Sequence, residues 1–199
     1  MGRTSLAAAR REQVLAAFAR CIARMGFAGT SLEDVAAEAG LARGHVRHYL
    51  GNRHDQVLAL TEWISTADQA EFDKVHDAPD DAARVQAVMR YLFDASFYEP
   101  GEDQAVLLAL FEEARRDDAL RKMFLDGYDD ILTTMSRALT SVDESMTAAR
   151  SKDIAYLMLC AAVGNAHLSQ SGVDPARARR LGPLSRRVLA MLVPATLTT

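Results

Sequence analysis

Four side chains between residues 43 and 48 could donate hydrogen bonds to a polyanion. They are Arg43, His45, Arg47 and His48. On a helix they leave Val46 and Leu50, four residues apart, free to face the protein interior. Arginine carries paired N–H groups that match phosphate oxygens and the major-groove edge of guanine. The segment therefore predicts a short helix with a buried apolar side and a basic outer side that fits a DNA groove.

A second short helix is expected immediately before this one. Thr30 or Ser31 can cap it, because an acidic residue follows each of them at the three-residue spacing of a capping box. Gly40 tolerates left-handed backbone angles and allows a tight turn between the two helices. Two short helices joined by a turn that contains glycine form a helix-turn-helix. Double-stranded DNA is therefore the first partner to consider.

The rest of the sequence repeats apolar residues at helical spacing, and no segment alternates as a strand would. We expect an all-α fold of about nine helices. The two short helices and one over residues 6–25 form a helix-turn-helix domain at 1–52, and a larger antiparallel helical domain covers 53–199. The helices expected in that larger domain cover residues 55–75, 80–99, 103–115, 120–139, 145–172 and 175–193.

Composition and charge indicate a folded chain with a basic N-terminal end. Of the 199 residues, 49% are hydrophobic and 25% are charged, which excludes a disordered chain. Residues 1–55 contain eight arginines and five acidic residues, whereas residues 56–199 carry a formal charge of -7. No apolar run approaches the ~20 residues of a membrane span and no export signal is evident, so we expect a cytoplasmic protein without a membrane partner. Cys21 and Cys160 are expected as buried thiols.

The run from Gly26 to Arg53 resembles the DNA-binding signature of the TetR family of bacterial transcriptional regulators. Residues 107–121 more weakly resemble the C-terminal domain of the choline- and betaine-responsive subgroup. The resemblance implies a homodimer that binds operator DNA through its N-terminal domain and a small-molecule effector through its C-terminal body. The chain departs from the family pattern at Ala42, where serine usually caps the second short helix, and at Arg47, Leu50 and Arg53.

The resemblance also implies which residues contact DNA. Arg43 and Arg47 are assigned to base edges, and Gly44 to a close approach of backbone and DNA. The other candidates are mostly assigned to phosphates, which set the register rather than the sequence preference. The full set is Thr30, Ser31, Arg43, Gly44, His45, Arg47, His48, Tyr49 and Arg53.

Effector and dimer residues are predicted from the helices that carry these roles in similar proteins. The effector candidates are Trp63, Tyr91, Phe97, Phe111, Phe124, Tyr128 and Asn165. Among them, Trp63, Tyr91 and Tyr128 could surround a quaternary ammonium by cation–π contacts. The dimer candidates on the last two helices are Cys160, Ala161, Gly164, Leu168, Leu184, Val188 and Met191. Each aromatic residue taken alone fits the hydrophobic core better than a ligand contact.

The sequence favours a ligand-responsive repressor that binds a palindromic operator as a homodimer and is released by a small molecule. A helical-bundle enzyme or small-molecule carrier without DNA binding is the main alternative. The two Glu-x-x-His motifs of a di-iron bundle are absent, as are a phosphate loop and a Cys-x-x-Cys pair, so neither an enzyme nor a bound metal or cofactor is expected. A third possibility is a protein-interaction module, whose binding would not depend on DNA.

Overall fold

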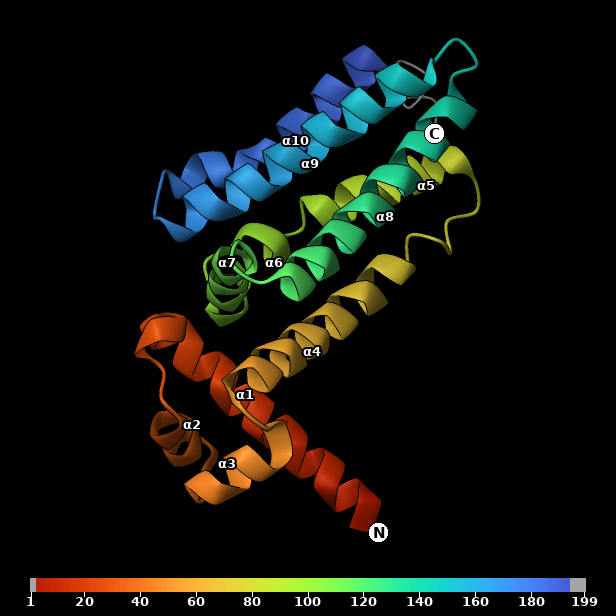
Figure 1. The fold of residues 1–199 in the computed structure, drawn as a ribbon. Coiled ribbons are helices and arrows are strands. Elements are labelled where there is room, and N and C mark those ends of the chain that lie inside the picture. The colour runs from red at the N-terminus through yellow and green to blue at the C-terminus, as the bar shows by residue number, and fades with distance from the viewer. Residues whose placement is uncertain (1–2, 194–199) are drawn as a thin grey trace. The chain divides into compact units, whose positions relative to one another are not determined.

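The structure is a computed structural model and describes residues 3–193. These residues form ten α-helices and no β-strand, which confirms the all-α fold (Figure 1). The helices are α1 (Arg3–Gly29), α2 (Leu32–Ala39), α3 (Arg43–Leu50), α4 (Arg53–Asp73), α5 (Asp81–Leu92), α6 (Ala95–Tyr98), α7 (Glu102–Ala114), α8 (Asp118–Val142), α9 (Ala148–Gln170) and α10 (Pro175–Leu192). None of them combines the length and the apolar character that crossing a membrane requires.

The count differs by one from the expected nine because the helix predicted over residues 80–99 is divided. Helix α5 ends at Phe93, whose φ of -120° is not helical. The side chain of Asp94 then accepts a hydrogen bond from the backbone N–H of Ser96 at 2.9 Å and begins α6. This bond, with a second one from the Ser96 hydroxyl group, holds the pKa of Asp94 below its usual value. The Asp–x–Ser turn at Asp94–Ser96 therefore divides a segment that apolar periodicity alone predicted as one helix.

The chain forms two compact units, and each unit is built from two separate segments of the sequence. The first unit contains the chain up to Ala67 together with Gly101–Met123, and the second contains Asp68–Pro100 together with the chain from Phe124 onward. Helix α7 belongs to the first unit because it packs against α1. Helices α4 and α8 each contribute to both units. The predicted functional boundary between residues 52 and 53 stays a prediction.

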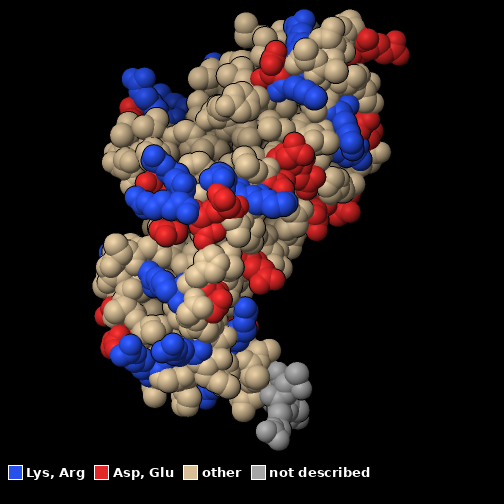
Figure 2. All heavy atoms as spheres, viewed as in Figure 1, with Lys and Arg blue, Asp and Glu red and all other residues tan. Residues whose placement is uncertain are grey.

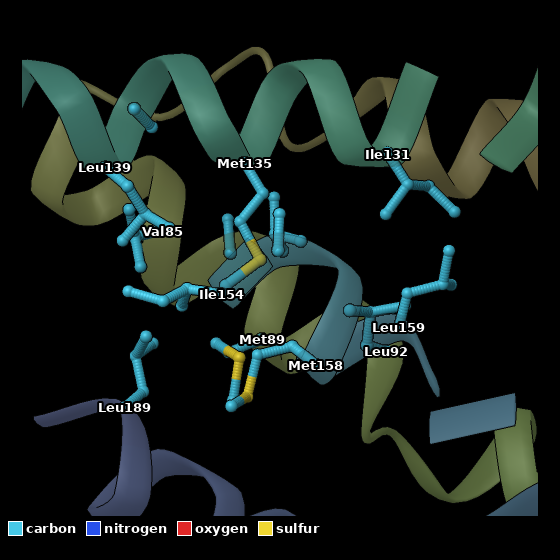
Figure 3. Packing of buried hydrophobic residues seen from close by; sticks show 14 of the residues in the cluster. Val85, Met89, Leu92, Ile131, Met135, Leu139, Ile154, Met158, Leu159 and Leu189 are labelled. Atoms are coloured by element: carbon cyan, nitrogen blue, oxygen red, sulfur yellow. The ribbon is translucent and has the colours of Figure 1, made fainter. Parts of the chain in front are cut away.

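The core of the second unit is built from α5, α8, α9 and α10. Three methionines meet there, Met89, Met135 and Met158, each at most 2% exposed. Figure 3 shows them facing one another, with leucine, isoleucine and valine side chains around them. Unbranched methionine side chains fill the irregular space between helices that cross at different angles.

Helix α1 is kinked at Gly26, where the sequence predicted its end, and continues to Gly29. Gly26 has a φ of +69°, outside the helical region, and only one further turn follows before the break ahead of α2. The hydroxyl group of Thr30 donates to the Gly26 carbonyl oxygen at 2.7 Å and fixes this break. The chain therefore leaves α1 at a defined place, and α2 packs against α1.

A second conformationally special glycine joins α3 to α4. Gly51 has a φ of +73° and a ψ of -147°, a combination that side chains other than glycine strongly disfavour. Asn52 and Asp55 exchange hydrogen bonds, from backbone N–H to side-chain oxygen, at 2.9 and 3.1 Å and so cap the start of α4. A methyl group on Gly51 would lie against the Asp55 carboxylate of this cap.

We expect Gly51→Ala to lower the free energy of unfolding by about 1–3 kcal/mol, because it combines backbone strain with a clash against the cap. Urea unfolding of the purified chain measures this loss. Gly44→Ala is the matched control: Gly44 is helical and a methyl group there meets no neighbouring atom, so stability should stay constant or rise. Equal stabilities of the two variants would contradict the role assigned to Gly51.

Candidate DNA-binding surface and effector site

Helix α2 is held in place by its cap and by two arginines of α1. Ser31 and Asp34 form the predicted capping box, and their hydrogen bonds lower the pKa of Asp34. Glu38 accepts from Arg20 at 2.6 Å and from Arg24 at 2.7 Å, and these bonds lower its pKa. Both arginines therefore fasten α2 to α1 and are not free to bind a phosphate.

The turn between α2 and α3 has the predicted glycine geometry. Gly40 has a φ of +64°, and its N–H donates to the end of α2. The N–H of Leu41 donates to the Ala36 carbonyl oxygen at 2.9 Å. These bonds satisfy carbonyl groups at the end of α2 and set the direction in which α3 leaves.

Helix α3 presents the predicted basic side to solvent. Val46 is fully buried and Leu50 is 4% exposed, which confirms the predicted inner side. The residues that face outward are Arg43, Gly44, His45, Arg47 and His48. Figure 2 shows Lys and Arg side chains gathered on the face of the first unit that α2 and α3 occupy. Tyr49 is half-buried, and its ring contacts that of His48 with the centroids 5.2 Å apart.

The first turn of α3 has no side-chain cap. Ala42 occupies the N-cap position with extended backbone angles and makes no capping bond, as its departure from the family pattern predicts. Among the described residues, the N–H groups of Arg43 and Gly44 have no hydrogen-bond partner, whereas that of His45 donates to the Ala42 carbonyl oxygen at 2.8 Å. Such an end attracts an anion, because unpaired N–H groups and the helix dipole both favour negative charge.

The two base-contact candidates differ in their surroundings. Arg43 pairs with Glu33 at 2.5 Å on the exposed surface, a contact that must open before Arg43 reaches a base. Arg47 makes no ion pair among the residues that the structure describes. Arg47 is therefore the freer of the two.

Three predicted phosphate contacts differ from one another in the structure. Ser31 is exposed but its hydroxyl group serves the capping box. Thr30 is 6% exposed and its hydroxyl group is bonded to Gly26, so it stabilises the fold and cannot face DNA in this conformation. Arg53 donates to the Phe27 carbonyl oxygen, and its guanidinium carbon lies 5.2 Å from the ring centre of Phe18 and 5.5 Å from that of Phe27. Burial lowers the pKa of Arg53.

Arg53 therefore joins the start of α4 to the end of α1. Its neighbour His54 adds a second link within the same unit, with Nδ1 3.0 Å from Oδ2 of Asp117, just before α8. These contacts surround a hollow of about 480 Å³ beside Phe27. The sequence pattern suggested a phosphate contact at Arg53 and no link at His54, because neither Phe27 nor Asp117 is near them in sequence.

The predicted effector residues divide between the two units. Trp63 and Phe111 belong to the first unit, and Tyr91, Phe97, Phe124, Tyr128 and Asn165 belong to the second. Within the second unit, the Tyr91 ring contacts Phe72 and Phe97, with centroids 5.1 and 5.9 Å apart. The Tyr91 hydroxyl group donates to Asp68 at 2.8 Å. Sequence reasoning missed Asp68 and Phe72, although their spacing of four residues places them on one side of α4.

Asn165 has a different environment from the aromatic candidates. It is 8% exposed, and its amide nitrogen donates to the Ala178 carbonyl oxygen at 3.3 Å. The bond links α9 to α10 and satisfies a buried polar group. We therefore leave Asn165 out of the proposed effector site.

The predicted dimer residues lie on α9 and α10 and are mostly accessible. Leu168, Leu184 and Met191 are 51%, 46% and 82% exposed. Cys160 is also exposed, so its expected burial within the chain is wrong. Ala161, Gly164 and Val188 are half-buried. Sequence reasoning missed Tyr156 and Leu157, two further exposed apolar residues of α9.

Comparison with known proteins supports one family. The family model described as "Bacterial regulatory proteins, tetR family" matches residues 14–60, which cover most of α1, all of α2 and α3, and the first part of α4. The chain is 28% identical over 176 residues to the HTH-type transcriptional regulator PksA of Bacillus subtilis (strain 168), covering 86% of this chain and 82% of that protein.

Two solved structures share the fold over nearly the whole chain. One is a putative transcriptional regulator from Saccharomonospora viridis in complex with choline, with a TM-score of 0.74, 18% identity, and coverage of 90% of this chain and 94% of that one. The other is AibR in complex with isovaleryl coenzyme A and operator DNA, with a TM-score of 0.68, 18% identity, and coverage of 93% and 98%. The helix-turn-helix geometry, the match to the family model and the similarity to PksA together show that this chain belongs to the TetR family of bacterial regulatory proteins.

Proposed function

We propose that this protein is a ligand-responsive transcriptional repressor that binds a palindromic operator as a homodimer and dissociates when a small molecule occupies its second unit. The observation that carries the proposal is the orientation of α3. Burial of Val46 and Leu50 turns an uncapped helix end and the side chains of Arg43, His45 and Arg47 toward solvent. A helix presented in this way fits the major groove.

In this proposal the side chains of α3 have different tasks. Arg47 reads a base edge, because its guanidinium is accessible and makes no ion pair in the described part of the chain. Arg43 joins it after leaving Glu33, at small cost because exposed ion pairs contribute little. The free N–H groups at Ala42–Gly44 bind a phosphate, and Gly44 lets the backbone come close. His48 and Tyr49 set the register on neighbouring phosphates.

Two similar structures that contain small molecules support a small-molecule effector. The regulator from Saccharomonospora viridis was crystallised with choline, and AibR with isovaleryl coenzyme A and operator DNA. These ligands differ in charge and size, so the shared fold does not define the effector of this protein. We place the effector among Tyr91, Phe97 and Tyr128, which are half-buried in the second unit.

The dimer is proposed from the apolar face of α9 and α10. Leu168, Leu184 and Met191 expose surface that a second copy can cover, and Tyr156 and Leu157 extend it along α9. A two-fold dimer also matches the symmetry of a palindromic operator. We further propose that the protein acts in the cytoplasm, where operator DNA is found in bacteria.

Membership of a family of transcriptional regulators counts against the helical-bundle enzyme and the small-molecule carrier. The salt dependence of DNA affinity distinguishes a repressor from a protein-interaction module. A protein that replaces counterions on DNA phosphates binds less tightly as salt concentration rises, with a slope set by the number of contacts. Affinity for DNA that does not change with salt would favour the module.

Arg47→Ala should weaken binding to a DNA fragment selected from genomic fragments by about 1–3 kcal/mol and leave binding to random DNA nearly unchanged, because a base contact is lost. Fluorescence anisotropy at two salt concentrations measures both affinities. Arg137→Ala, which removes the same charge from an exposed position on α8, is the control and should not alter either affinity. Equal losses on selected and random DNA would assign Arg47 to a phosphate.

Arg53→Ala should lower the free energy of unfolding of the first unit by about 1–2 kcal/mol, because a charged hydrogen bond and two cation–π contacts disappear. Thermal and urea unfolding without DNA provide the measurement. Arg47→Ala carries the same charge change and should unfold like the unmodified chain. If Arg53→Ala leaves stability intact but weakens binding to every DNA, the original assignment to a phosphate is correct.

Leu168→Glu combined with Met191→Glu should convert a dimer into a monomer, since four carboxylates would enter the apolar interface. Light scattering at micromolar concentration reports the mass, and DNA binding should fall with it. Leu6→Glu is the control, because Leu6 is 64% exposed on α1, outside the proposed interface. A monomeric mass for the unmodified chain would contradict the dimer.

A further inference from the structure

The Asp68 carboxylate is held by a phenol rather than by a cation. Tyr91 Oη donates to Asp68 Oδ1 at 2.8 Å. Over residues 3–193, Asp68 forms no ion pair with Lys, Arg or His. Glu71 lies one turn further along α4 and already pairs with Lys74 at 2.5 Å. No cation among these residues therefore pairs with Asp68, whose side chain is exposed to solvent.

The surroundings of Asp68 disfavour this charge. Asp68 is exposed to solvent, and the protein around part of its carboxyl group, together with the charge of Glu71, raises its pKa. The hydrogen bond from Tyr91 opposes both effects without cancelling them. A positive charge placed beside Oδ2 would stabilise the carboxylate.

A second polar group near Asp68 also lacks a partner. Tyr128 of α8 is half-buried, and its hydroxyl group makes no hydrogen bond to any residue between 3 and 193. Burial raises the pKa of Tyr128, and the nearby charge of Asp68 raises it further. The charge of Asp68 thus acts on the Tyr128 phenol, and each of the two groups keeps an oxygen that can accept a hydrogen bond.

The aromatic rings do not form an open cage for a quaternary ammonium. The Tyr91 ring is already in contact with Phe72 and Phe97, and Phe72 is only 3% exposed. The group that best matches free acceptor oxygens is a cation with N–H donors, which a quaternary ammonium lacks.

A metal ion fits the site poorly. Calcium takes six to eight oxygen ligands and magnesium a near-octahedral set, whereas Asp68 supplies one carboxylate. Among the described residues no group of three or more His, Cys, Asp or Glu side chains is arranged to hold a metal. The phenols beside Asp68 are neutral and suit an organic ligand.

We propose that Asp68, Tyr91 and Tyr128 bind a protonated primary or secondary amine, whose N–H groups donate to Asp68 Oδ2 and Tyr128 Oη. The apolar part of this ligand lies against the accessible edges of Tyr91 and Phe97. The inference rests on the proposed function and deepens it, because it gives the effector a positive charge and hydrogen-bond donors. An anionic acyl ligand would be repelled at the same place.

The test uses the full chain and three matched probes: 2-phenylethylamine, its trimethylated quaternary form and 2-phenylethanol. A second amine, hexylamine, shows whether the apolar part matters. Isothermal titration calorimetry measures their binding to the unmodified chain, to Asp68→Asn and to Glu71→Gln. Asp68→Asn keeps the side-chain shape and an acceptor for Tyr91. Glu71→Gln removes an equal charge from the same helix.

We expect both amines to bind, the quaternary ion and the alcohol to bind at least about tenfold more weakly, and Asp68→Asn to lose about tenfold or more in amine affinity. Glu71→Gln should change amine affinity by less than about threefold, since long-range charge effects are screened. The proposal is overturned if neither amine binds at millimolar concentration, if the quaternary ion binds as tightly as the amine, or if the two variants lose affinity equally.

DNA anisotropy in the presence of each probe separates this inference from the proposed function. Amines that bind through Asp68 and release DNA support both. Amines that bind through Asp68 without releasing DNA support the site and contradict its role as the effector site. In a third outcome, the protein binds the selected DNA, an anionic acyl probe releases it, and the amines do not bind. This outcome supports the proposed repressor and contradicts the amine site.

Discussion

Burial of Val46 and Leu50 determines which side of α3 reaches solvent, and the proposed recognition of DNA depends on it. Side chains on a helix have fixed angular positions. Because Val46 and Leu50 are buried, Arg43, His45 and Arg47 lie on the exposed side of α3. The position of α3 depends on its packing against α2. Arg20 and Arg24 in turn hold α2 against α1 through Glu38. Arg20, Arg24 and Glu38, which are not proposed to contact DNA, thus help to orient the residues of α3 that are.

Arginine has two different roles at positions 47 and 53. Arg47 extends into solvent from the middle of a helix, whereas Arg53 turns back toward two phenylalanine rings and a carbonyl group of α1. Guanidinium suits both places, because it is weakly hydrated, stacks on aromatic rings and carries directed donors. A cation near a helix-turn-helix is therefore not by itself a phosphate contact, and its role follows from what lies beside it.

Charge also distinguishes the second unit. Its core is apolar and rich in methionine, yet Asp68 keeps a carboxylate close to that core with only a phenol as partner. The Asp68 carboxylate is exposed to solvent and has no cationic partner among the described residues, so it is open to pairing with a cationic ligand. The sign of that ligand follows from Asp68, and its donors follow from the open acceptors on Asp68 and Tyr128.

Local sequence was enough to predict most of the helices, a capping box at Thr30 or Ser31, the turn at Gly40 and the uncapped start of α3, because neighbouring residues create each of them. It also identified the inner and outer sides of α3, since periodicity alone sorts them. It missed the break between α5 and α6. Tertiary structure decided that Thr30 and Arg53 serve the fold, that Asn165 links α9 to α10, and that Asp68 lies beside Tyr91. Thr30 bonds to Gly26, four residues away, whereas the roles of Arg53, Asn165 and Asp68 depend on partners far away in sequence. Periodicity records which side of a helix is buried but not what buries it.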